Sequence, residues 1–227
     1  EYGSTGFHLD FAGTNVGTGA VGTVGEDKSG NGNHFTSTNV ASHDVVPDSP
    51  TNNFATLNSL AGNIDPAEGN LKIAPSNAHS AAGTTKFVNK GKWYVEYTGV
   101  SWTNQPVIVF YTPEAPYNGI YAGTSSTDVW YWRANGVWST AGYNTENSGF
   151  PQWSTGDIVG VLLDFDNDAI FGFVNGSPVS YSGNKLFSTS ILDKNFGITI
   201  KAYNGSHYIN YGQDHTFAGA KTPTQVY

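Results

Sequence analysis

The chain has 227 residues, of which only 12% are charged, and its formal net charge is −8. Ten Lys and Arg residues scattered along the chain are too few for a phosphate-binding surface, so we expect neither nucleic acid nor a membrane as a partner. No apolar run approaches the ~18 residues of a membrane-spanning helix, and the absence of Cys excludes disulfides, thiolate catalysis and cysteine-bound zinc. The absence of Met, with no leader-like start, indicates a processed chain or a fragment of a longer protein.

Residues 1–87 contain short apolar islands separated by turn-rich stretches. The islands are 7–11 and 53–57, and the stretches 27–34 and 48–53 are dense in residues that tolerate positive φ. With 14% aromatic residues and 28 Gly, the composition favours short strands and tight turns over helices. Because these islands are too small for a core of their own, we predict that 1–87 packs on the remainder and that 1–227 is a single domain.

Strand patterns follow one another through residues 88–227. The predicted strands are 92–97, 106–111, 129–134, 137–139, 158–165, 169–174, 196–200 and 207–211. Asn135-Gly136 predicts a hairpin with a type I′ turn, and Asn175-Gly176 predicts a second turn. The predicted core residues are Trp93, Val95, Tyr97, Val107, Val109, Val161, Leu163, Phe171, Phe173, Ile198 and Ile200. This pattern predicts an all-β fold, an antiparallel β-sandwich with almost no helix.

Three stretches in this part carry distinctive sequence motifs. They are GKWYVE at 91–96, then GDIVGVLLDF with FGFVNG at 156–165 and 171–176, and finally INYG at 209–212 shortly before Phe217. In this order and spacing they resemble the SPRY domain over residues 88–220. The resemblance implies a bent two-sheet sandwich, of SPRY or concanavalin-like jelly-roll type, and recognition through loops at one end.

A second resemblance lies in the N-terminal part. Residues 9–11, 27–33 and 48–54 resemble segments of bacteriophage tail and tail-fibre proteins, and 27–33 also resembles laminin-G-like lectin modules. This resemblance implies a fibre or spike domain on the virion surface, or an extracellular protein, that attaches to a host. Its partners would be a bacterial surface glycan or protein and other virion proteins, and a homo-oligomer stays open.

Catalytic and metal-binding motifs are missing from the sequence. It contains no G-x-S-x-G, H-E-x-x-H or phosphate-binding glycine motif, and its six His are dispersed. The acidic run 164–168 imitates half of a calcium loop, but Ala169 and Asn175 stand where Gly and Glu are needed. Asp27 with Asn31 and Asn33 is a second candidate for calcium. We predict turns at both places, no metal or other cofactor, and no enzymatic activity.

Aromatic side chains crowd between residues 101 and 153. In the predicted hairpin Trp130 and Trp132 share one face and Tyr131 lies on the other, so some rings are expected to reach solvent or a partner. Exposed rings beside polar groups suit sugar stacking or a protein hot spot, although packing in the core and rim would also explain them. The predicted ligand-binding residues are Tyr117, Tyr121, Asp128, Trp130, Trp132 and Trp138, with Asn104, Asn118 and Asn144 as polar neighbours.

These observations together predict a non-enzymatic recognition module on a phage fibre or spike. The alternatives are a secreted carbohydrate-binding lectin, a structural virion component for decoration or assembly, and a polysaccharide-degrading enzyme.

Overall fold

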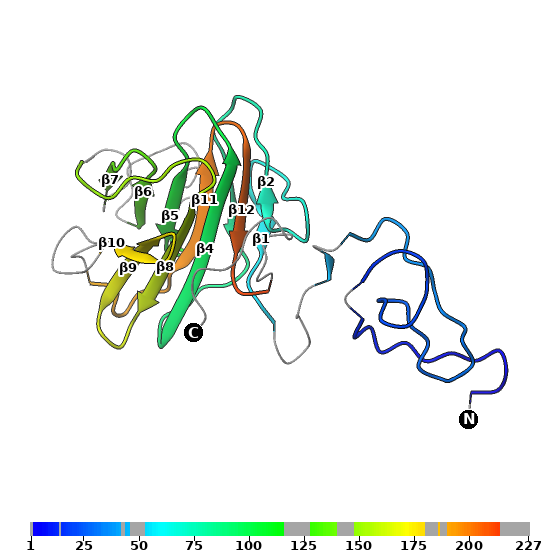
Figure 1. Ribbon diagram of the computed structural model, residues 1–227. Coiled ribbons are helices and arrows are strands. Elements are labelled where there is room, and N and C mark those ends of the chain that lie inside the picture. The colour runs from blue at the N-terminus through cyan, green and yellow to red at the C-terminus, as the bar shows by residue number, and fades with distance from the viewer. Residues whose placement is uncertain are drawn as a thin grey trace.

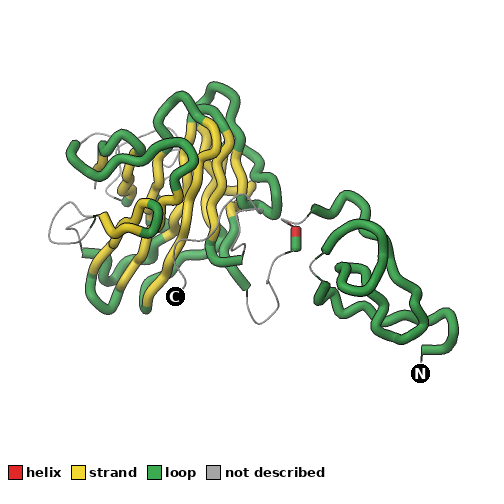
Figure 2. Tube along the Cα trace, viewed as in Figure 1, coloured by secondary structure: helices red, strands yellow, loops and turns green. Residues whose placement is uncertain are grey.

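The protein is an all-β sandwich of two antiparallel sheets, as predicted (Figure 1). The computed structural model describes residues 2–13, 15–41, 44–45, 53–115, 128–139, 148–179, 186 and 190–213. The strands of this part of the chain are joined by loops, and the short piece that Figure 2 colours as helix is a single 3₁₀ position at Asp44. Within the same residues, no helix is long and apolar enough to cross a membrane.

Each sheet has six strands that run out of sequence order. The first sheet has the order β1 (Leu57–Gly62), β3 (Ser80–Thr84), β11 (Gly197–Ala202), β5 (Val107–Tyr111), β6 (Val129–Arg133) and β7 (Trp138–Ser139). The second has the order β10 (Ser177–Val179), β9 (Ala169–Val174), β8 (Ile158–Asp164), β4 (Lys92–Ser101), β12 (Ser206–Asn210) and β2 (Lys72–Ile73). The predicted strands from 92 onward are confirmed within a few residues, whereas β1, β2, β3 and β10 were not predicted.

The two Asn-Gly turns differ in geometry. Asn175 and Gly176 both have positive φ, 50° and 77°, and they join β9 to β10 as a two-residue type I′ turn. Asn135 is not among the residues with positive φ, and only Gly136 is left-handed, with φ 78°. Gly136 N donates to Arg133 O at 2.9 Å, which closes a four-residue turn one position earlier. The hairpin of β6 and β7 is therefore confirmed, but the predicted type I′ turn at Asn135-Gly136 is wrong.

The main core lies between the sheets and takes side chains from both. Its fully or almost fully buried members include Phe110, Trp132 and Ile200 from the first sheet and Val161 and Leu163 from the second. Most predicted core residues are buried, but three are not. Trp93, at the start of β4, is 42% exposed, while Phe171 and Phe173 are half-buried because Ile170 and Gly172 take the inward positions of β9.

The first sheet is buried on its outer face as well. A second apolar cluster covers this face, formed by Ala81, Val107, Val109, Tyr111, Val129 and Tyr131. Trp130 and Trp132 point into the main core while Tyr131 lies in the second cluster, and all three are at most 3% exposed. The expectation that some of these hairpin rings reach solvent is therefore wrong for these three, because both faces of β6 are covered.

Residues 2–41 form a loop-rich, hydrogen-bonded structure with isolated bridges in place of long strands, such as Leu9 with Asp27. Phe7 packs edge-on against Phe35 at 4.8 Å between ring centroids and remains 50% exposed. Leu57, from the other predicted island, is fully buried in the main core. The single-domain organisation of 1–227 stays a prediction.

A buried polar pair lies inside the sandwich. His207 Nε2 lies 2.7 Å from Asn204 O, and because a carbonyl oxygen can only accept, Nε2 carries the proton. The other ring nitrogen, Nδ1, then accepts the hydroxyl proton of Tyr97 at 2.9 Å. Burial of His207 lowers its pKa, against the opposing effect of the Asn204 carbonyl. The neutral imidazole thus connects β4 to the turn between β11 and β12.

Replacing a core leucine tests the placement of β8. Leu163 is completely buried, so Leu163→Ala should reduce the free energy of unfolding by about 2–5 kcal/mol in urea melts. Leu60, which is 93% exposed on β1, is the matched control, and Leu60→Ala should change stability by less than about 0.5 kcal/mol. Equal effects of the two substitutions would contradict this arrangement of the strands.

The buried imidazole makes stability depend on pH. In the unfolded chain a histidine titrates near pH ~6.5, whereas His207 in the folded protein takes up its proton only at lower pH. The unfolded state therefore binds more protons as the pH falls below about 6.5, and the folded state loses stability over that interval. His207→Gln should flatten this decline in urea melts between pH 7 and 5. In the unchanged protein, NMR should show that His207 takes up its proton at lower pH than a histidine of the unfolded chain, and uptake at the same or a higher pH would refute the assignment.

Candidate functional site

A polar cavity of about 330 Å³ lies at one end of the first sheet. We call it the polar pocket, and its lining residues are His79, Asn104, Gln105, Val107, Arg133, Asn135, Lys201 and Ala202. No carboxylate and no hydroxyl side chain belongs to this described lining.

The floor of the polar pocket is one cross-strand row of the first sheet. Val107 on β5 is paired with Lys201 on β11 and with Arg133 on β6, and Lys201 is paired in turn with Ala81 on β3. Directly paired residues point to the same face of a sheet, so Lys201, Val107 and Arg133 all face outward. The second apolar cluster occupies the rest of this face, so the cationic side chains lie where the apolar surface ends.

Burial restrains the side chain of Lys201, and contact with an aromatic ring restrains that of Arg133. Lys201 is only 5% exposed although it carries an ammonium group. The guanidinium carbon of Arg133 lies 5.5 Å from the centroid of the Tyr131 ring, within the range of a cation–π contact. Each side chain is thus held against the sheet instead of extending into solvent.

The loop between β4 and β5 supplies two amides, and the turn after β11 holds this loop in place. Asn204 Oδ1 accepts hydrogen bonds from the backbone N–H of Thr103 and Asn104, at 3.2 and 3.3 Å. Asn204 Nδ2 donates to Thr103 Oγ1 at 2.6 Å, and the Asn204 carbonyl accepts from His207. The loop carrying Asn104 and Gln105 is therefore connected to the buried core through a single asparagine.

His79 enters the polar pocket from the segment before β3. Its ring meets the Tyr203 ring edge-on at 5.0 Å between centroids, and its carbonyl accepts from Asn63 Nδ2 at 2.9 Å. Partial desolvation, followed by the positive charges of Lys201 and Arg133, lowers the pKa of His79. Near neutral pH the pocket therefore combines two fixed cations with an uncharged imidazole and three amides.

Two further cavities lie elsewhere in the described chain. One, of about 260 Å³, opens between the sheets near Trp93 and Leu163 and is mostly apolar, so it continues the core. The other, of about 220 Å³, is lined by Thr112, Glu114, Asp128, Asp193, Lys194 and Asn195. Of the three, the polar pocket alone combines a buried charge with converging amides.

Of the predicted ligand-binding residues, the four that the structure describes do not line the polar pocket. Tyr117 and Tyr121 lie outside the described residues, as do Asn118 and Asn144. Trp130 and Trp132 are buried in the core, where Trp132 packs at 4.6 Å against Trp153 and donates its Nε1–H to Pro151 O. A covered ring offers no face to a ligand in this conformation, so these two positions are explained by packing.

Asp128 and Trp138 take intermediate positions. Asp128 is half-buried and lines the 220 Å³ cavity together with Lys194, whose ammonium lies 5.3 Å from the Trp130 ring centroid. Trp138 is half-buried and stacks on Phe150 at 4.6 Å. Ligand binding by these two residues stays a prediction.

The stretch 101–153 does contribute to the polar pocket, through Asn104, Gln105, Val107, Arg133 and Asn135. Sequence reasoning named Asn104 as a polar neighbour and missed the others. Lys201 could have been found from the sequence, since it is the only charged residue in the strand Gly197–Ala202, in which every residue but Thr199 is otherwise apolar. His79 had no such signal, because the fold alone brings it beside β11.

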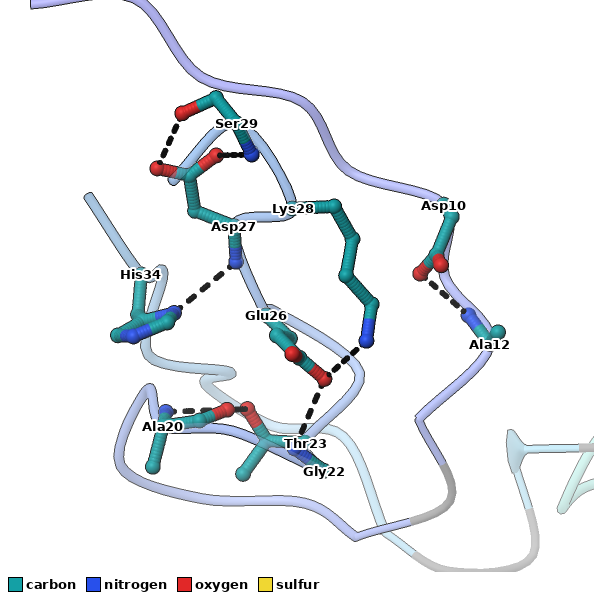
Figure 3. Close-up of polar contacts among 10 residues, drawn as sticks. All are labelled: Asp10, Ala12, Ala20, Gly22, Thr23, Glu26, Asp27, Lys28, Ser29 and His34. Atoms are coloured by element: carbon teal, nitrogen blue, oxygen red, sulfur yellow. Dashed lines mark hydrogen bonds and ion pairs between the residues drawn. The ribbon is translucent and has the colours of Figure 1, made fainter. Parts of the chain in front are cut away.

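In the two stretches considered for calcium, the carboxylates of Asp27 and Asp164 accept hydrogen bonds from neighbouring residues of the protein. Asp27 accepts four hydrogen bonds, from the N–H of His8, Ser29 and Asn33 and from the Ser29 hydroxyl, at 2.8–2.9 Å. Figure 3 shows the two bonds from Ser29 beside the bond that Asp27 N donates to His34. Burial opposes ionisation, but these donors lower the pKa of Asp27 well below its usual range.

Asp164 accepts from the backbone and side chain of Asn167, as expected for a turn. In the part of the chain that the structure describes, no group of three His, Asp or Glu side chains is placed to hold a metal ion.

Comparisons with known proteins find similarity in structure and none in sequence. No family model matches the chain, and no curated protein matches it. Among solved structures, the SPRY domain of human HERC1 is similar at 13% sequence identity and a TM-score of 0.46. The superposition covers 63% of this chain and 90% of that domain.

Proposed function

We propose that this chain is a non-catalytic recognition module that binds its ligand in the polar pocket. The observation that carries the proposal is the convergence of Asn104, Arg133 and Lys201, from a loop and two strands, on one cavity. Binding sites need a few polar groups held in fixed directions. The buried sheet and the Asn204 hydrogen bonds supply that fixed framework.

The chemistry of the lining favours binding over catalysis. His79 is the one lining residue that could act as a base near neutral pH, and the described lining offers no hydroxyl or carboxylate for it to activate. Amides both donate and accept hydrogen bonds, which suits the hydroxyl groups of a sugar or the polar groups of a protein surface.

We further propose that the ligand is a glycan or protein on a bacterial surface and that the module belongs to a virion fibre or spike. This part rests on the tail-fibre resemblance of residues 9–54. The rival proposals are a secreted lectin with the same site, a structural virion component and a polysaccharide-degrading enzyme.

An array of bacterial surface glycans, with labelled protein, tests the proposed function. We expect Asn135→Ala to weaken binding roughly two- to tenfold, as for the loss of a hydrogen bond. The melting temperature should fall only slightly, because the one structural bond that is lost, from Val137 N to Asn135 Oδ1, lies in an exposed turn. Asn195→Ala is the matched control, because this exposed amide lines the cavity that contains Asp128.

If Asn195→Ala weakened binding and Asn135→Ala did not, the site would lie in the cavity that contains Asp128. Absence of binding to any glycan or whole cell would favour the structural role. Release of reducing ends from the bound polysaccharide would reveal an enzyme.

A further inference from the structure

We propose that the cavity between the two sheets is a second binding site, and that it takes an uncharged aromatic molecule of about two fused rings. We call it the apolar cavity. It shares no described lining residue with the polar pocket, so the inference goes beyond the proposed function and does not depend on it. Five of its twelve described lining residues are aromatic, namely Phe54, Trp93, Tyr94, Phe196 and Tyr211.

The exposure of Trp93 marks the mouth of the apolar cavity. Trp93 on β4 is paired with Leu163 on β8, and directly paired residues point to the same face of a sheet. Leu163 is completely buried in the main core, so Trp93 occupies an inward position, yet it is 42% exposed. Ile198 on β11 of the other sheet lines the same cavity. The two sheets therefore separate at this end of β4 and leave an aromatic ring accessible between them.

The walls of the apolar cavity are held by hydrogen bonds and close packing. Trp93 Nε1 donates to Lys90 O at 2.8 Å, which restrains the indole. Gln213 Nε2 donates to Ala55 O at 2.7 Å, which restrains the wall on the other side of the chain. The neighbouring Phe54 ring lies against Gly212, where a Cβ would come within 3.0 Å of the ring. The cavity is thus formed before a ligand arrives, as is usual for small-molecule sites.

The volume and the lining rings indicate the size and class of the ligand. An apolar cavity of about 150 Å³ is enough to hold benzene, so the 260 Å³ of the apolar cavity accommodates two fused rings. Protein interiors are close-packed, and a ligand here would supply contacts that the surrounding side chains lack. Aromatic rings attract one another in edge-to-face and offset stacked arrangements, which favours an aromatic ligand over an aliphatic one.

Two polar side chains of the lining are bonded to the protein backbone. The Tyr211 hydroxyl donates to Ile198 O at 2.7 Å, and the Lys86 ammonium donates to Asn53 O at 2.5 Å. A charged or hydroxyl-rich ligand would lose its hydration among the apolar walls, whereas an apolar ring gains free energy by leaving water. The lining therefore favours an uncharged ligand.

An NMR titration of the full chain with indole tests the inference. We expect saturable shifts of the Val88, Leu163 and Ile198 methyl signals and of the Trp93 Nε1–H signal, with a dissociation constant below about 1 mM. n-Octanol has the same number of non-hydrogen atoms but no ring. It should bind roughly three- to tenfold more weakly, because it lacks the ring contacts.

Four variants locate the site. Trp93→Leu should weaken indole binding roughly tenfold, because it removes the accessible ring and keeps an apolar side chain. Phe11→Leu is the matched control, since Phe11 is a 65% exposed ring outside the lining. Ala55→Leu, which fills part of the cavity, should weaken binding without lowering the melting temperature. Asn135→Ala should leave indole binding unchanged, so the failure of one site is distinguishable from the failure of the other.

Several results would overturn the inference. Absence of these shifts at millimolar indole would refute the site, and equal affinities for indole and n-octanol would refute the selection of an aromatic ring. Tighter binding of indole-3-acetate than of indole would show that the ligand is an anion. Tighter binding of N-acetyltryptophanamide would assign the cavity to a side chain of a partner protein. Unaltered binding in both Trp93→Leu and Ala55→Leu would place the indole elsewhere.

Discussion

Burial of the first sheet on both faces constrains where this protein can place charge. Its central strands β11 and β5 pack their inward side chains into the main core. The outward side chains of β5 lie in the second apolar cluster, and Thr199 and Lys201 on the outward face of β11 are buried as well. A charged side chain in the middle of such a strand would lose its hydration on either side. Lys201 and Arg133 instead occupy the row at the end of the sheet, where their long side chains reach the polar cavity.

The loops around the polar pocket are held by the same core. The side chain of Asn204 accepts hydrogen bonds from the backbone of Thr103 and Asn104. The Asn204 carbonyl accepts a hydrogen bond from His207. His207 in turn bonds Tyr97 between the sheets. Only a neutral imidazole can accept the Tyr97 hydroxyl proton at Nδ1 while Nε2 donates to Asn204 O. One titratable residue therefore connects the loop to the core.

The strands of the sandwich could be predicted from the sequence better than the residues of the polar pocket. Strands with an alternating or continuous apolar pattern, such as β4 and β8, can be predicted well from the local sequence. The strand Ser80–Thr84 consists of Ser, Ala, Ala, Gly and Thr, which carry no such pattern, and its five residues are buried by tertiary packing alone. The prediction for the aromatic hairpin failed for a related reason. Alternation predicts that one face of a strand is exposed to solvent, whereas both faces of β6 are buried.

The polar pocket could be located in part. The stretch 101–153 was expected to bind a ligand, and it supplies five of the eight lining residues. Those expected to bind were large aromatics, however, and the structure uses Trp130 and Trp132 as core. Lys201 lies on β11 and His79 lies just before β3. These two segments are neighbours only through the strand order β3-β11-β5, which no local pattern reveals.

The central proposal is that the polar pocket at the end of the first sheet is the binding site of a recognition module. A crystal structure of the protein with a glycan selected on the array tests it most directly. The account predicts the ligand within hydrogen-bond distance of the Asn104 and Asn135 side chains. A ligand bound in any other cavity would contradict it.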